Sequence, residues 1–299
     1  MSRYGLLGSY LSSLNSRKMV IPIYTFPAVI NLLISSHLTP NITETLLLVL
    51  SVTLTSYSVY WYNDYIDTYV ELGTEEFKET THSQRPLAKG LVTKNQFLGF
   101  ILATSLAGLL LAYMINIYVL ALQVTFLALG YIYSTEPMRL KRRFTGKQLT
   151  IIAGCTVAGL SGALVNGTVL PQNMYSLLIN SLVYLSGSSL GDVRDVSVDR
   201  KIGVRTFPVV LGPELTIRFA LGIFVAVILA GFVGYIGLGF NLALPLLTTI
   251  VMAVWIFSTY PLIRRWRDSV YVEKIVWKRI VPMNILVQVI PLVGILAFR

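Results

Sequence analysis

The sequence predicts an all-α membrane protein, a polytopic bundle of nine transmembrane helices. Three observations lead to this fold class. The chain is 55% hydrophobic and 13% charged, where soluble domains carry roughly 25% charged residues. Apolar runs near the roughly 20 residues needed to cross a bilayer recur along its whole length. Lys and Arg fall on alternate connections between those runs, as they do in polytopic proteins.

Hydropathy places the nine spans, and we expect the whole chain, 1–299, to form a single transmembrane domain. The spans are 19–38, 45–65, 96–114, 117–133, 149–169, 175–191, 217–237, 242–262 and 280–298. The third and fourth are separated by Asn116 with almost no loop between them. The lone Cys155 lies inside a span and excludes a disulfide framework.

The distribution of Lys and Arg predicts the orientation. The connections 39–44, 115–116, 170–174 and 238–241 contain no Lys or Arg, and the opposite connections contain many. Basic loops face the cytoplasm, so we expect the N-terminus inside the cell membrane and the C-terminus outside. A formal charge of +10 is compatible with nucleic-acid binding, but its spread over the loops of one side of a bilayer argues against that partner and favours the bilayer itself.

An acidic motif ends the second span. Asn63, Asp64, Asp67 and Glu71 fall within one quadrant of a helix at 100° per residue. Carboxylates at the end of an apolar span are costly unless they reach water or have a function. Carboxylate and amide oxygens are the ligands that Mg²⁺ prefers. The motif therefore predicts a metal site.

A second acidic motif follows the sixth span. Asp192, Asp195 and Asp199 repeat the spacing of the first motif. We therefore expect two pseudo-repeats, about 19–148 and 149–262, followed by a ninth helix at 280–298, with the two motifs facing each other. Each motif opens a long connection, 66–95 or 192–216, and we expect short helices in both.

Two facing acidic motifs predict a catalytic site for a diphosphate, in which bound Mg²⁺ reverses the repulsion between carboxylates and phosphate. Basic side chains then complete the phosphate cage. The candidates are Arg85, Lys89, Arg139, Lys141 and Arg205. Any one of them is explained equally well by the charge rule for loops. Interface aromatics face a carbocation or line a lipid pocket; these are Tyr60, Trp61, Tyr62, Tyr131 and Tyr133.

These motifs, taken together, resemble the UbiA superfamily of intramembrane prenyltransferases. Its N-D-x-x-D-x-x-x-D signature is matched from Asn63 to Glu71, and its R-P-x-x-x-G element from Arg85 to Gly90. The Y-x-x-x-P-x-R-L-K element is matched at Tyr133, Pro137, Arg139, Leu140 and Lys141. The second acidic motif is matched at Asp192, Asp195 and Asp199, and its G-x-x-T-x-P tail at Gly203, Thr206 and Pro208. The chain departs from the family at Glu71, at Arg17-Lys18 in place of an early R-P pair, at Gly146-Lys147 in place of a G-N pair, and in a longer 68–84 segment.

The resemblance implies nine helices around a central cavity, with an opening into the bilayer for a prenyl chain. It implies Mg²⁺ held by Asp64, Asp67, Glu71, Asp192, Asp195 and Asp199, with Asn63, Tyr133 and the five basic residues binding an isoprenyl diphosphate. The reaction it implies is transfer of a polyprenyl group to a lipophilic acceptor with release of diphosphate. The spacing from Asp192 to Thr206 most resembles digeranylgeranylglyceryl phosphate synthases, whose acceptor is a prenylated glycerol phosphate.

Other acceptors and other classes of protein stay open. An aromatic quinone precursor, a tetrapyrrole or a carotenoid end would also suit a lipophilic acceptor site. Internal duplication and membrane acids are features of transporters, although transporter acids lie near the midplane and these lie at helix ends. A non-catalytic lipid-binding protein is the third class, and the intact acidic motifs argue against it.

Overall fold

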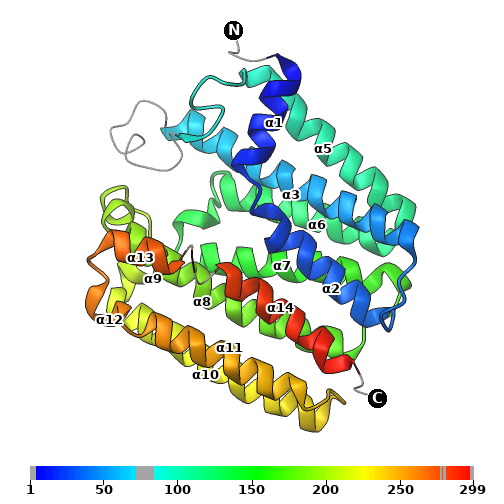
Figure 1. Ribbon diagram of the computed structural model, residues 1–299. Helices are drawn as coiled ribbons and strands as arrows, with labels where there is room; N and C mark the ends of the chain where they lie inside the picture. Colours follow the sequence, from blue (N-terminus) through cyan, green and yellow to red (C-terminus); the bar gives the residue numbers. More distant parts are fainter. Residues whose placement is uncertain (1–4, 72–83, 277, 279–280, 297–299) are drawn as a thin grey trace.

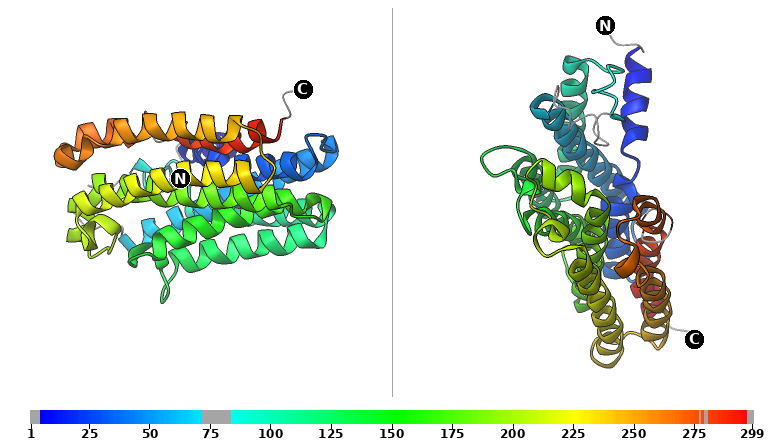
Figure 2. Two further views of the ribbon diagram at one scale, coloured as in Figure 1. Left: turned by 90° about the horizontal axis from the view of Figure 1, so that it is seen from below. Right: turned by 90° about the vertical axis from the view of Figure 1, so that its left-hand side faces the viewer.

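The computed structural model describes residues 5–71, 84–276, 278 and 281–296, and this part of the chain is helical throughout its regular structure (Figure 1). The helices are α1 (Leu6–Ser16), η1 (Ile21–Thr25), α2 (Phe26–Ser35), α3 (Ile42–Glu71), α5 (Lys94–Ile115), α6 (Ile117–Ser134), η3 (Leu140–Arg142), α7 (Gly146–Ala163), η4 (Leu164–Asn166), α8 (Pro171–Lys201), α9 (Phe207–Val210), α10 (Pro213–Gly237), α11 (Ala243–Thr259), α12 (Leu262–Arg265), α13 (Ser269–Ile275) and α14 (Val281–Ile295). The long helices run side by side in both further views (Figure 2).

Each predicted span corresponds to a helix of the structure, and the protein is an integral membrane protein. Six helical segments in the described chain are long and apolar enough to cross a bilayer; they contain α3, α5, α6, α7, α10 and α11. A seventh candidate is α1 together with η1 and α2, a pair bent by 56°. The Ser, Asn and Gly residues along α8 make it less apolar than the other long helices, and α14 is only 15 residues long, so neither is among the six. The count of nine membrane crossings stays a prediction.

The structure corrects two of the predicted boundaries. The connections expected at 66–95 and 192–216 begin later, because α3 continues to Glu71 and α8 continues to Lys201. Both acidic motifs are therefore the last turns of long helices. Arg200 and Lys201 stand in the last turn of α8, where cations complement the negative end of the helix dipole. The short helix α9 lies in the second connection, as expected.

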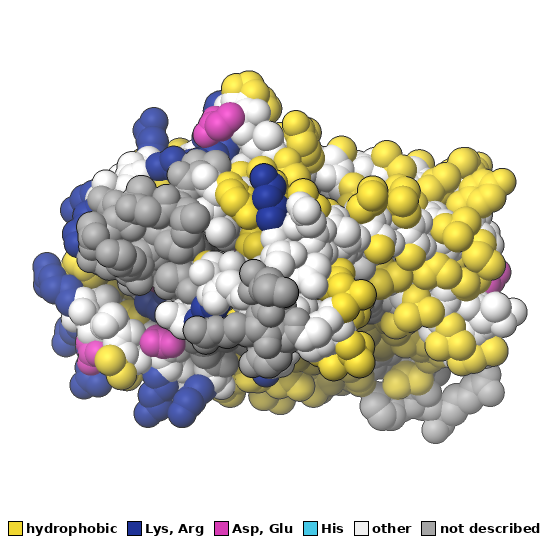
Figure 3. Space-filling view, turned by 90° about the horizontal axis from the view of Figure 1, so that it is seen from above, with side chains coloured by type: hydrophobic (Ala, Val, Ile, Leu, Met, Phe, Trp, Pro, Cys, Tyr) yellow, Lys and Arg dark blue, Asp and Glu magenta, His cyan; other side chains and the backbone are white. Residues whose placement is uncertain are grey.

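The outer surface matches a lipid environment. On α5, Leu102, Leu106 and Leu110 repeat every fourth residue and are exposed, which puts them on one face of the helix. Figure 3 shows hydrophobic side chains gathered over the right-hand part of the face in view, while Lys and Arg gather at the left-hand end. A large exposed apolar surface marks contact with a membrane or a partner. Here the exposed apolar side chains belong to helices that are long enough to span a membrane.

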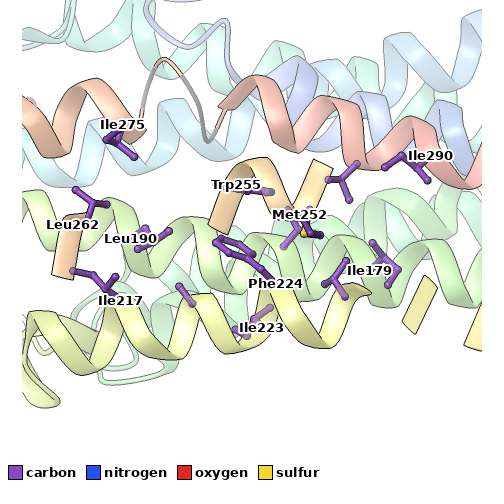
Figure 4. Packing of buried hydrophobic residues seen from close by; sticks show 14 of the residues in the cluster. Ile179, Leu190, Ile217, Ile223, Phe224, Met252, Trp255, Leu262, Ile275 and Ile290 are labelled. Carbon is purple, nitrogen blue, oxygen red and sulfur yellow. The ribbon is translucent and has the colours of Figure 1, made fainter. Parts of the chain in front are cut away.

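Two buried apolar clusters hold the bundle together. The larger joins α8, α10, α11 and α14 (Figure 4), and within it the Phe224 and Trp255 rings stack with centroids 4.6 Å apart. The second joins η1 and α2 to α3, α6, α7 and α8 around Tyr24 and Phe126. A third, smaller cluster packs α1 and α5 against the fully buried Trp61 of α3.

Buried polar bonds and small residues fix how close the helices approach. Asn173 of α8 donates from Nδ2 to the Asn31 carbonyl of α2 at 2.8 Å, and both side chains are buried. A Cβ added at Gly162 of α7 would lie 1.8 Å from the Ala28 carbonyl oxygen of α2. Only glycine allows this approach. Contacts of this kind suit membrane bundles, where apolar burial alone does not distinguish a neighbouring helix from lipid.

Local sequence explains two breaks that matter for the site. Asn116 ends α5 in an extended conformation and caps α6, its Oδ1 accepting from the Val119 amide at 2.8 Å. The predicted break at this residue is confirmed. Near the N-terminus the chain turns between Ser16 and Ile21. This bend separates α1 from the membrane-spanning run and places Arg17 at the end of α3.

Candidate active site

Asp64 lies in the last turns of α3 and is 2% exposed. Arg17, at the bend after α1, donates from Nε to Asp64 Oδ2 at 2.9 Å and from Nη2 to Oδ1. Arg85 Nε lies 3.7 Å from the same Oδ1, and Arg85 Nη1 donates to the Ser16 carbonyl at 2.9 Å. Two guanidinium groups from separate parts of the chain therefore neutralise one buried carboxylate. This arrangement is needed because a buried charge without a partner is costly.

Asp67, one turn further along α3, is 1% exposed. The Lys141 ammonium contacts its Oδ1, and Arg139 Nη2 lies 3.7 Å from that oxygen. Asn63 donates from Nδ2 to Asp67 Oδ2 at 3.0 Å, and Asn63 Oδ1 accepts from the Ser134 hydroxyl at 3.2 Å. Asn63 therefore orients the first acidic motif and ties it to the end of α6.

The segment from residue 135 to 146 carries those basic groups and is tightly folded. Arg139 takes a left-handed conformation with φ 33°, and its side chain is buried. A Cβ at Gly146 would lie 2.6 Å from the Leu140 carbonyl oxygen, so glycine is required where α7 begins against η3. This close contact brings Lys141 and Lys147 to the same end of the bundle.

The second acidic motif has a different set of partners. Asp192, 3% exposed, is contacted at Oδ1 by the Lys147 ammonium and accepts from Gln148 Nε2 at Oδ2 at 2.8 Å. The Asp195 side chain is 42% exposed and is bonded by the adjacent Arg194 at 2.7 Å to each oxygen. Asp199 accepts from the Thr206 hydroxyl at 3.1 Å.

Cations from both halves meet between the two motifs. Lys141, bound to Asp67, lies within electrostatic range of Arg17 and Lys147. Burial, opposed by the attraction of Asp64 and aided by the neighbouring cations, lowers the pKa of the Lys141 ammonium to about 7. Burial also lowers the pKa of Arg85, and the Arg17 charge adds to that effect. A cluster of desolvated, mutually repelling cations favours an added anion.

A cavity of about 190 Å³ opens beside this cluster. Its walls come from η1, α3, α6 and α7, and Arg17, Asn63 and Tyr133 stand at its charged end. Tyr24, Tyr60 and Phe126 line the rest together with aliphatic side chains. Arg17 lies over the Tyr60 ring at 5.0 Å. A second cavity of about 260 Å³, between η1, α7, α8 and α14, shares Tyr60 and Ile151 with the first.

The structure divides the aromatic candidates into two groups. Tyr60 and Tyr133 line the cavity. Trp61 is fully buried and donates to the Ser13 carbonyl at 3.2 Å, and Tyr62 stacks on Tyr131 with centroids 5.7 Å apart. These three support packing in the described structure. Helix register decides the division, since Tyr60 and Trp61 point about 100° apart.

Several predicted site residues lie away from this cluster or beyond what the structure describes. Lys89 and Arg205 have exposed side chains; the Arg205 backbone N–H donates to the Arg142 carbonyl at 3.0 Å. Glu71 ends α3, but its side chain lies outside the described residues. Their phosphate-binding and metal-binding roles stay predictions.

The donor set can be tested against a divalent ion. No group of three acidic, His or Cys side chains in the described chain is already gathered as a metal site. The buried carboxylates of Asp64 and Asp67 are hard oxygen donors only one helical turn apart, and the Asn63 amide is bonded to Asp67; oxygen donors of this kind are the ligands that Mg²⁺ prefers. The first motif therefore fits the ion, provided that Arg17 and Lys141 move from carboxylate to phosphate.

Five partners of the acids were not among the predicted site residues: Arg17, Lys147, Gln148, Arg194 and Thr206. Two of them stand at family motif positions where the chain departs from the pattern: Lys147 replaces the G-N asparagine, and Arg17 keeps the arginine of the early R-P pair while Lys18 replaces its proline. These departures from the family pattern were the signal in the sequence that could have identified Arg17 and Lys147 as site residues. Gln148 carried no such signal, because its role follows from the first turn of α7 facing α8.

A family model described as the UbiA prenyltransferase family matches residues 24–290. The chain belongs to that family. Among curated relatives, a digeranylgeranylglyceryl phosphate synthase of Pyrococcus furiosus is 26% identical over 193 residues, covering 64% of this chain and 65% of the relative. The chloroplastic chlorophyll synthase of Oryza sativa subsp. japonica is 27% identical over 162 residues, covering 51% and 41%. The matched segments thus span less than two thirds of these relatives.

Solved structures support the same fold over nearly the whole chain. A structure described as giving insights into digeranylgeranylglyceryl phosphate synthase in membranes superposes with a TM-score of 0.73 at 21% identity, covering 97% of this chain and 98% of that one. A UbiA homolog from Archaeoglobus fulgidus bound to GPP and Mg²⁺ gives 0.71 at 17% identity, covering 96% and 98%. The predicted UbiA-type helical fold is confirmed.

Proposed function

We propose that this protein is an intramembrane prenyltransferase that transfers a polyprenyl group from an isoprenyl diphosphate to a lipophilic acceptor. The main support for the proposal is the position of three basic side chains. Arg17, Lys141 and Lys147 lie between two acidic motifs at the charged end of a tyrosine-lined cavity. A diphosphate suits the cations, and a prenyl chain suits the apolar walls.

Each part of the reaction has a residue set to serve it. The bond between the prenyl C1 and the diphosphate oxygen breaks, and the electron pair leaves with diphosphate. Arg17, Arg85 and Lys141 receive that charge as it develops on the leaving oxygens. Mg²⁺, held by Asp64 and Asp67 with Asp192, Asp195, Asp199 and Glu71 as further candidates, would neutralise the same charge. Tyr60 and Tyr133 border the prenyl carbon and shield it from water.

The remaining basic candidates keep their proposed roles. Arg139 lies beside Asp67 and adds a buried positive charge under the phosphate site. Lys89 and Arg205 reach the diphosphate only if their exposed side chains turn inward when it binds. This movement distinguishes them from Arg85, which already lies beside Asp64.

The acceptor we favour is a prenylglycerol phosphate, the substrate class of archaeal ether-lipid synthesis. The support is the spacing of the second motif and the similarity to digeranylgeranylglyceryl phosphate synthases. Its hydroxyl oxygen forms the new bond to the prenyl carbon and gives its proton to the released diphosphate. The similarity to chlorophyll synthase favours a tetrapyrrole acceptor as the second candidate.

The charged end of the bundle faces the cytoplasm of the cell membrane in this proposal, with the C-terminus outside. The support is the gathering of Lys and Arg at one end (Figure 3) and the charge rule for loops. Cysteines introduced at the exposed Asn41 and Thr168 react with an impermeant thiol reagent from outside, and one at Lys147 reacts only after the membrane is opened. Reaction of the latter in sealed cells contradicts this orientation.

The test of the function uses purified protein in lipid nanodiscs with labelled geranylgeranyl diphosphate and Mg²⁺. Geranylgeranylglyceryl phosphate, a tetrapyrrole and a quinone precursor are offered separately, and the products are identified by mass. We expect release of diphosphate and a prenylated product with the glycerol phosphate. Diphosphate release with a different acceptor leaves the reaction class standing and changes only the acceptor. Absence of release with every acceptor, together with a Mg²⁺- or proton-dependent flux in vesicles, favours a transporter instead.

A further inference from the structure

Asp192 is the one carboxylate of the described motifs whose two oxygens are held by consecutive residues of a single helix. Lys147 contacts Oδ1, and Gln148 donates to Oδ2 at 2.8 Å. The carboxylate is 3% exposed. Its neutralising cation and its second hydrogen bond are therefore both supplied from the first turn of α7. No rearrangement of another segment is needed to complete them.

The cations of the first motif are attached differently. Arg17 lies at the bend after α1, Arg85 lies in a connection, and Lys141 lies in the short turn η3. Lys147 is the second residue of α7, and its helix starts where a Cβ at Gly146 would already collide with the Leu140 carbonyl. The backbone at Lys147 is therefore fixed at the start of a long helix, whereas the first-motif cations lie in the connections between long helices.

We propose that the Lys147 ammonium stands permanently where a divalent ion would otherwise bind Asp192, so that the second motif contributes one built-in cation and the site takes up one divalent ion fewer. This inference rests on the proposed function, because it concerns how that site neutralises a diphosphate. An ammonium has three donors and no acceptor. One N–H satisfies Asp192, and the other two can bind a phosphate oxygen as a point charge.

Two further contacts support a permanent place for this cation. Lys147 lies within electrostatic range of Asp199 as well as Asp192, so it offsets more than one carboxylate of the second motif. It also lies within range of Tyr133, which lines the cavity beside the first motif. An ion approaching Asp192 would meet a like charge at contact distance, whereas an asparagine at 147 would offer it a neutral oxygen ligand.

The experiment counts bound ions rather than turnover. Purified protein in nanodiscs is titrated with Mn²⁺ in the presence of inorganic diphosphate, and free Mn²⁺ is measured by electron paramagnetic resonance. We expect Lys147→Asn to bind one Mn²⁺ more per chain than the wild type. Lys147→Arg keeps the charge and keeps the wild-type number. Arg143→Gln, which removes an exposed positive charge from the same segment, is the matched control and also keeps it.

A second variant, Asp192→Asn, tests the proposal independently if Lys147→Asn fails to fold. Because no ion binds Asp192 under this proposal, Asp192→Asn leaves the wild-type Mn²⁺ number unchanged. A lower number in Asp192→Asn, or equal non-zero numbers in the wild type and Lys147→Asn, shows that Lys147 leaves Asp192 when the ions bind, and overturns the inference while the proposed function stands. Absence of Mn²⁺ binding by every variant overturns the metal-dependent function itself.

Discussion

The two acidic motifs repeat each other in sequence and differ in their surroundings. Asp64 and Asp67 are 2% and 1% exposed, and their cations come from 47 and 74 positions away in the chain. In the second motif exposure increases from Asp192 to Asp195, whose partner is the neighbouring Arg194. A repeated spacing therefore fixed where the acids stand on their helices, and the neighbouring helices gave each motif its own electrostatics.

The two motifs also differ in which parts of the chain hold their carboxylates. The first motif is closed by segments that connect helices. The second is partly open and is held from within α7 and α8. The first three predictions compare a residue in or beside the first motif with a counterpart in or beside the second, and the last concerns the second motif alone.

The largest effect is expected on turnover. Asp67→Ala and Asp195→Ala should each lower kcat by on the order of 10²–10³-fold, the loss typical when one preorganised stabiliser of developing charge is removed. Diphosphate release from labelled donor measures it. The control is Arg143→Gln, which lies in a basic loop and should turn over normally. Near-normal Mg²⁺-dependent turnover in either Asp variant would remove that motif from the site.

Stability should separate the same two variants. Asp67→Ala leaves the buried Lys141 without its carboxylate, and breaking a buried pair in this way costs about 3–5 kcal/mol. The Asp195 side chain is 42% exposed, so its loss costs about 0–1 kcal/mol. Thermal unfolding in detergent compares them. The burial of Asp67 therefore predicts a lower melting temperature for Asp67→Ala than for Asp195→Ala. Equal melting temperatures would contradict it.

Substitutions of the basic residues should lower kcat/KM for the prenyl donor by different amounts. Arg85 lies 3.7 Å from Asp64, and loss of a charge-assisted contact of about 1.5–3 kcal/mol corresponds to roughly 10–150-fold in kcat/KM. Arg85→Lys should recover only part, since the planar fork is lost. Arg205→Ala should cost less than about 10-fold, because an exposed charge contributes about 0–1 kcal/mol. Donor kinetics at saturating acceptor measure this, and a reversed order would place Arg205 nearer the diphosphate.

The smallest effect is expected at the end of the second motif. Thr206→Val removes the hydroxyl that Asp199 accepts from at 3.1 Å, which should cost about 0.5–1.5 kcal/mol of stability. Thr206→Ser keeps the hydroxyl and serves as the control. Thermal unfolding of the two variants gives the difference. Identical unfolding of both variants would mean that this bond contributes nothing measurable.

Most of the architecture was predictable because each signal is local. Apolar runs gave every long helix, the Asn116 break was visible, and four motifs in order gave the family. Helix ends were less accurate: the polar last turns of α3 and α8 looked like loop because charged residues ended the apolar runs. The early helix α1 was missed because it lies before the first apolar run.

The sequence by itself determined the membrane class, the family and the placing of acids and bases at helix ends, since these follow from hydropathy and spacing along one chain. Only the tertiary structure decided which base meets which acid. Arg17 reaches Asp64 because the chain bends after α1, and Lys147 reaches Asp192 because α7 packs against α8. These pairings join residues tens of positions apart, and burial makes them obligatory, because a carboxylate removed from water needs a cation that only a neighbouring segment can supply.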